Sequence, residues 1–149
     1  MERNAIEELL TAALQSLYEE DLLTIQLDVG ERMICAQLRS ILQRFFPDHS
    51  VHAEYNRHGL EPKDIEMPDA EGEPTTVRVF PDIIVHQPTH DDANLLVIEV
   101  KKSTNPCGDD FDIAKLEQMK WQLGYTYAVF IRLPTGPAAS FADIQMSWV

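Results

Sequence analysis

Three residues on two neighbouring segments of the chain have the types and spacing for chemistry assisted by a metal ion. The segment VFPDIIVH places Asp82 directly after Pro81, and the segment LLVIEVKKS places Glu99 and Lys101 two residues apart. Side chains alternate along a strand, so Glu99 and Lys101 are predicted to project from the same face. If the two segments pair as a hairpin through residues 87–94, Asp82 comes near Glu99. Two carboxylates and one ammonium group would then converge at the surface of a sheet.

Such a combination suits the cleavage of phosphodiester bonds. Two carboxylates can hold Mg²⁺, which prefers oxygen ligands and keeps several waters in its coordination shell. The ion polarises a phosphate and lowers the pKa of a bound water. A lysine beside it can orient or help deprotonate the attacking water, or offset charge that develops on the phosphate. The alternative is a surface ion pair at the end of a strand, with no chemical role.

Two amphipathic helices are predicted before the sheet. Apolar residues recur at helical spacing in residues 5–18, and again from Glu31 to about Phe46. Pro47 and Asp48 are predicted to end the second helix, because proline cannot continue it.

Three strands are predicted to follow, over Val51–Asn56, Thr76–His86 and Leu95–Lys101. The intervening stretch Arg57–Thr75 is rich in Gly, Pro and acidic residues, which indicates a loop or a loose hairpin. Residues 95–98 are apolar on both faces, which is typical of a central strand that is covered on both sides.

A third helix and further strands complete the predicted fold. Asp112 is a plausible N-cap for a helix that runs to about Leu123, and Gly124 is well placed at its C-terminal end. Tyr125–Leu133 then reads as a strand parallel to the 95–101 strand, because a helix connects the two. Asp143–Val149 could add an edge strand. The expected fold is one three-layer α/β domain over residues 1–149.

The motif resembles that of the PD-(D/E)XK nuclease superfamily, which has the restriction-endonuclease-like fold. The shared pattern is PD, a sixteen-residue gap and then EVK, in the order helix, three antiparallel-paired strands, helix, strand. It covers about residues 31–133 and leaves an extra N-terminal helix outside the core. The stretches FPDIIVH, NLLVIEVKKS and DIAKLEQMKWQLGY also look like small stand-alone bacterial proteins of this fold, many of unassigned role.

The resemblance implies a set of site residues. Asp82, Glu99 and the backbone carbonyl of Val100 would bind Mg²⁺ or Mn²⁺, and Lys101 would complete the catalytic group. Members of the superfamily often add a glutamate from the first core helix, a further acid on the first strand, and a Lys or Gln on the helix after the EXK strand. The matching residues in this sequence are Glu31, Glu54, Lys115 and Gln118. For each of these the alternative is a solvated or structural charge on a helix or strand.

The resemblance implies a nuclease that acts on nucleic acid, DNA before RNA, in repair, restriction or mobile-element defence. The net charge of −13 weighs against tight independent binding, because proteins that bind phosphates are usually basic. The alternative is therefore a binding or regulatory module of the same fold that has little turnover and needs a partner, such as a basic protein. Pairing into a homodimer stays open.

Composition favours a cytoplasmic protein. Cys35 and Cys107 are the only cysteines, so no disulfide framework is expected. No apolar run approaches the roughly 20 residues that cross a membrane, and the N-terminal residues lack the pattern of a secretory signal.

Overall fold

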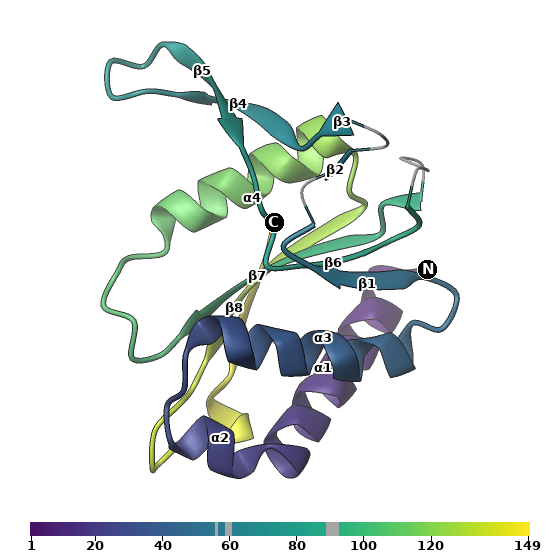
Figure 1. Ribbon diagram of the computed structural model, residues 1–149, viewed down its shortest axis with the longest axis vertical. Helices are drawn as coiled ribbons and strands as arrows, with labels where there is room; N and C mark the ends of the chain where they lie inside the picture. Colours follow the sequence, from purple (N-terminus) through teal and green to yellow (C-terminus); the bar gives the residue numbers. More distant parts are fainter. Residues whose placement is uncertain (56, 59–60, 89–92) are drawn as a thin grey trace.

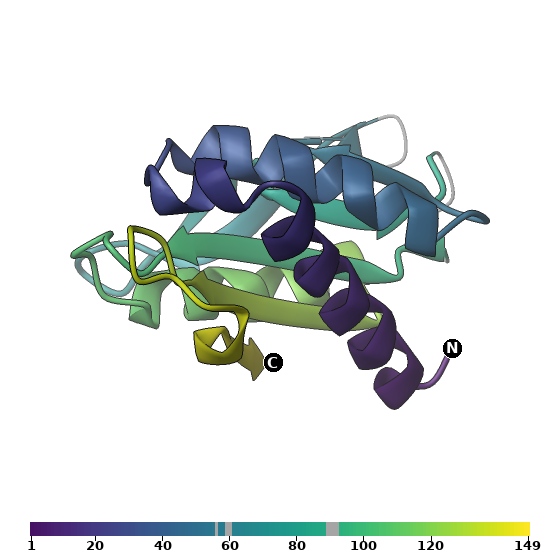
Figure 2. The same cartoon turned by 90° about the horizontal axis from the view of Figure 1, so that it is seen from below.

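The fold is mixed α/β, with helices on both faces of a five-stranded sheet (Figures 1 and 2). The structure is a computed structural model and describes residues 1–55, 57–58, 61–88 and 93–149. Two parts of the predicted loops, at residues 59–60 and 89–92, and the predicted strand end at Asn56 lie outside the described residues.

The helices and strands follow one another in the order predicted, with additions. The helices are α1 (Arg3–Glu20), α2 (Leu22–Gln26), α3 (Glu31–Phe45) and α4 (Asp110–Leu123). The strands of the main sheet are β1 (Ser50–Ala53), β6 (Ile83–His86), β7 (Leu96–Lys102), β8 (Tyr127–Leu133) and β9 (Gln145–Trp148), with the 3-10 turn η2 (Phe141–Asp143) before the last. Two small hairpins lie outside the sheet, formed by β2 (Arg57–His58) with β3 (Glu61–Pro62) and by β4 (Asp64–Pro68) with β5 (Pro74–Arg78).

The main sheet has the strand order β1-β6-β7-β8-β9. The β6–β7 pair is antiparallel, with Ile83 opposite Ile98, and β7–β8 is parallel. Both results confirm the predicted hairpin and the crossover through α4. The strand β7 is central, as its apolar run indicated, and β9 confirms the predicted edge strand.

Two hydrophobic cores flank the sheet. On one face, Ile83, Ile98 and Val100 pack with the apolar stripes of α1 and α3. On the other face, Ile84 and Val97 pack with α4 and with the base of the β4–β5 hairpin. Because the face alternates along β7, Glu99 lies on the side of α4 together with Val97, whereas Ile98 and Val100 face α1 and α3.

Two predictions about element boundaries are wrong. The segment Thr76–His86 is not one strand: β5 ends at Arg78 and β6 begins at Ile83. Pro81 lies in the break, where it lacks the amide that a continuous ladder would need. The helix α4 begins at Asp110, so Asp112 lies within its first turn and is not its N-cap.

The end of α4 offers a test of the fold. Gly124 has a left-handed backbone with φ of 73°, which confirms the predicted C-terminal position and which glycine adopts without strain. We expect Gly124→Ala to lower the free energy of unfolding by about 1 kcal/mol in a urea titration. The matched control is Gly108→Ala, because a Cβ added there meets no atom within 4 Å. Equal effects of the two substitutions would contradict this account.

No helix within the described residues combines the length and apolar character needed to cross a membrane.

Candidate metal centre

The β6–β7 hairpin brings Asp82 and Glu99 together. Asp82 immediately precedes β6, and Glu99 is the residue after Ile98, where the pairing of the two strands ends. The Oδ2 atom of Asp82 accepts a hydrogen bond of 2.8 Å from the amide of Val100. The amide of Asp82 in turn lies 3.4 Å from Oε1 of Glu99. The carboxylate of Asp82 thus accepts the hydrogen bond that a further residue of β6 would accept from β7. These two contacts hold the two acids side by side.

The same break places a backbone oxygen beside the two acids. In a strand, the N–H and C=O of one residue point to the same neighbouring strand. Because the amide of Val100 points toward Asp82, the carbonyl of Val100 lies along the same edge of β7. Two carboxylates and this carbonyl therefore lie where β6 has turned away from β7.

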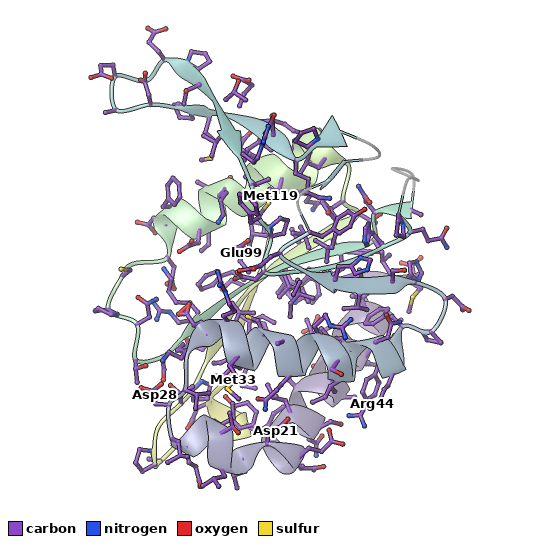
Figure 3. The ribbon with its side chains drawn as sticks, viewed as in Figure 1. Asp21, Asp28, Met33, Arg44, Glu99 and Met119 are labelled. Atoms are coloured by element: carbon purple, nitrogen blue, oxygen red, sulfur yellow. The ribbon has the colours of Figure 1, made fainter. Side chains whose placement is uncertain are left out.

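Burial makes the two carboxylates costly to ionise. Glu99 is only 5% exposed and lies between α3 and α4 (Figure 3). Its burial and the nearby Asp82 raise the pKa of Glu99 to about 8, although Lys115 partly offsets the shift. Burial likewise raises the pKa of Asp82, against the opposing effects of the Val100 amide and Lys115. Without a cation, the state in which the pair keeps one proton is favoured over the state in which both carboxylates are charged.

The donor set fits a hard divalent cation. Carboxylate and carbonyl oxygens are the ligands that Mg²⁺ takes from proteins, and it commonly uses only one or two carboxylates, with waters and substrate phosphates completing the shell. Within the described residues, no group of three or more His, Cys, Asp or Glu side chains could share an ion. An ion held by two acids would keep positions open to water and substrate.

The two lysines of the site contact different acids. Lys101 shares its face of β7 with Glu99, as predicted, but its Nζ binds Asp112 and the carbonyl of Gly108 at 2.9 Å. The Nζ that contacts Glu99 belongs to Lys115 of α4, at 3.3 Å from Oε2. The ammonium group closest to the acids thus comes from the helix.

A cleft of about 400 Å³ leads from Asp82 toward α3. Glu31 and Glu54 both line it, so the structure places these two predicted residues beside Asp82. Glu31 accepts a hydrogen bond of 3.1 Å from Asn105, and Glu54 pairs with Arg32 at 3.3 Å. Glu54 lies just beyond β1 rather than on it, with φ of 53°, and its amide donates to the carbonyl of Pro81.

Cys35 lies beside these acids. Its thiol is buried in the wall of the cleft, and burial raises its pKa, with further contributions from Asp82, Glu31 and Glu99.

Gln118 lies apart from this centre. Its Oε1 accepts a hydrogen bond of 2.7 Å from Gln122, and it lines a separate pocket between α4 and the β4–β5 hairpin. The structure does not bring it to Asp82 or Glu99.

Sequence reasoning missed Asp112, Asn105 and Arg132, which hold the residues around the acids. Asp112 and Lys115 are three residues apart on one helix face, a spacing that could have indicated a joint role. Asn105 and Arg132 carry no such signal, because their partners are set by the path of the loop between β7 and α4.

Comparisons with known proteins add no independent indication of function. Neither protein-family models, nor curated proteins, nor solved structures gave a match to this chain.

Proposed function

We propose that this chain is a metal-dependent nuclease of the PD-(D/E)XK superfamily that hydrolyses phosphodiester bonds, with DNA as the first substrate to test. The observation that carries the proposal is the meeting of the buried carboxylate of Glu99 with the half-buried carboxylate of Asp82, at the point where β6 and β7 part. The order of α3, the antiparallel strands β1, β6 and β7, the crossover helix α4 and the parallel strand β8 supports the proposed restriction-endonuclease-like fold.

In this proposal, Asp82, Glu99 and the carbonyl of Val100 hold Mg²⁺ or Mn²⁺. When bound, the ion supplies polarisation of the phosphate and a water of lowered pKa. The amide of Val100 fixes the orientation of Asp82 through one carboxylate oxygen and leaves the other oxygen for the ion. An ammonium group on this side of the sheet, either Lys101 as the motif implies or Lys115 from α4, offsets charge that develops on the phosphate. Glu31 and Glu54 line the approach through the cleft.

The net charge of −13 favours a second candidate function. A chain with this charge lacks the excess of basic residues that neutralises phosphates in independent nucleic-acid binding. The alternative is a binding or regulatory module with little turnover, or a subunit that cuts only when a basic partner supplies the contact to nucleic acid. Either would keep the metal centre but show no cleavage alone.

The test is a calorimetric titration with Mg²⁺ and Mn²⁺, followed by incubation with plasmid, linear, branched and RNA substrates. We expect the wild type to bind Mn²⁺ and Asp82→Ala to lose more than about 100-fold in affinity, the upper range found when a residue that only supports a metal ligand is removed. The control is Asp64→Ala, which removes an exposed acid from the β4–β5 hairpin. A wild type that binds neither ion at millimolar concentration contradicts the enzymatic proposal. Binding without cleavage of any substrate favours the alternative.

A further inference from the structure

Helix α4 supplies a partner of opposite charge to each member of the Glu99/Lys101 pair. Lys115 contacts the strand's glutamate, and Asp112 contacts the strand's lysine. The two helix residues lie one turn apart on the same face, and the two strand residues lie on the same face of β7. The result is two ion pairs side by side, which differ in how firmly each lysine is held.

Lys101 is held by two acceptors. Its Nζ contacts the carboxylate of Asp112 and donates to the carbonyl of Gly108, and its side chain is 10% exposed. The loop that carries Gly108 is itself held in place, because Arg132 donates to the carbonyl of Cys107 before it and to the carboxylate of Asp109 after it. Neither acceptor of Lys101 belongs to the proposed metal centre, so a bound cation would leave both in place.

Lys115 is held less firmly than Lys101. Within the described residues, its ion pair with the acids is the 3.3 Å approach to Oε2 of Glu99, and its side chain is 20% exposed. Glu99 is the carboxylate that a divalent cation would claim. A cation there would neutralise the partner of Lys115 and repel its ammonium group. The flexible four-carbon stem of lysine allows that group to move away without a shift of the helix.

We propose that Lys115, and not Lys101, is the ammonium group that meets the substrate phosphate, and that Asp112 is a positioning residue that keeps Lys101 fixed to α4. The inference rests on the proposed function, because it assumes that a divalent cation binds Asp82 and Glu99. The proposal reverses the roles that the EXK motif implies. The strand lysine has a structural role, and the helix lysine carries the mobile charge.

The test measures acetylation of each lysine by an N-hydroxysuccinimide ester, read by mass spectrometry, with and without Mn²⁺. We expect Mn²⁺ to raise the labelling rate of Lys115 by about fivefold or more, which corresponds to the loss of one modest interaction. Labelling of Lys101 should stay low in both conditions. Lys120, on the same helix but bonded to the carbonyl of Val149 at 2.7 Å, is the internal control and should not respond.

Substitution of Asp112 separates positioning from general stability. In Asp112→Asn, we expect the labelling of Lys101 to rise while Lys115 keeps its response to Mn²⁺. Asp112→Glu, which keeps the charge, should restore the protection of Lys101. If cleavage is found, Lys115→Gln should lower kcat more than Lys101→Gln, with Lys120→Gln as the matched control.

The outcomes distinguish this inference from the proposed function. If calorimetry shows that Mn²⁺ binds, but Lys115 stays protected or Lys101 becomes the reactive group, the inference is overturned and the metal centre stands. If Mn²⁺ does not bind the wild type, both are overturned together. Because the first comparison uses only the wild type, a variant that fails to fold does not remove the test.

Discussion

Glu99→Gln is expected to make the metal-free protein more stable at pH 8 by about 3 kcal/mol and to abolish Mn²⁺ binding. The cause is the burial of Glu99 beside Asp82, which raises the pKa of Glu99 from 4.5 to about 8. Glutamine cannot ionise, so it avoids the cost of a buried charge. Its one amide oxygen can still accept from Lys115 or from the backbone amide of Asp82, and its NH2 group takes the place of the proton that Glu99 keeps.

The pH dependence has a definite sign. Between pH 4.5 and about 8 the folded wild type keeps a proton on Glu99 that the unfolded chain has released. Stability is therefore fully present below pH 4.5 and falls as pH rises, by up to about 1.4 kcal/mol for each pH unit. Over the shift from 4.5 to about 8 this slope gives at most about 5 kcal/mol, and the expected total is about 3 kcal/mol because the protein and entering water relax around the new charge.

Urea denaturation in EDTA at pH 6, 7, 8 and 9 measures this effect. The wild type should lose stability across the series, Glu99→Gln should show a flatter profile, and Mn²⁺ should restore the wild type alone. Glu54→Gln is the control, because it removes an exposed carboxylate from the same cleft and should keep the wild-type slope. A wild-type stability that is constant or rises from pH 6 to 8 would show that Glu99 is ionised without cost.

The centre of the fold was predictable because its signals are local. The apolar run of residues 95–98 indicated a central strand, and the helix between two strand-like segments indicated a parallel pair, as the structure has them. Alternation along β7 placed Glu99 and Lys101 on one face. The proximity of Asp82 to Glu99 then followed from the antiparallel pairing of their strands. The restriction-endonuclease-like identity of the fold stays a prediction.

The partners of the charged groups could not be predicted in the same way. Lys101 was expected to face the acids, but two strand residues on one face are about 7 Å apart, far enough for each to find a different partner on α4. Which partner is available depends on where α4 begins, and the helix starts three residues earlier than expected. Because of this difference, Asp112 is not the N-cap of α4 but the acid that binds Lys101.

The break at Pro81 shows a second limit. Residues 76–86 contain an almost continuous run of β-branched and apolar types, which favours one strand. The chain divides there because β5 pairs with β4 outside the main sheet, while β6 pairs with β1 and β7 within it. The choice between two sheets depends on long-range pairing, and residue preferences do not carry that information.

The loop between β7 and α4 depends on one side chain from β8. Arg132 donates to the carbonyls of Lys102, Asn105 and Cys107 at 2.7, 2.9 and 2.7 Å, and to Oδ1 of Asp109 at 2.7 Å. These bonds bind most of the length of the loop to the end of the sheet. The loop in turn delivers the Gly108 carbonyl to Lys101 and Asn105 to Glu31.

Arg132→Gln is therefore expected to lower the free energy of unfolding by about 3 kcal/mol, because it leaves several carbonyls and one carboxylate without their charged donor. Urea denaturation measures the loss, and hydrogen exchange should show faster exchange of the Cys107 amide, which donates within this loop. Arg78→Gln is the matched control: Arg78 pairs with Asp64 at 3.1 Å on the exposed β4–β5 hairpin, so its loss should cost no more than about 1 kcal/mol. If both variants lose similar stability, the loop is held by its own turns, and Lys101 and Glu31 keep their partners without Arg132.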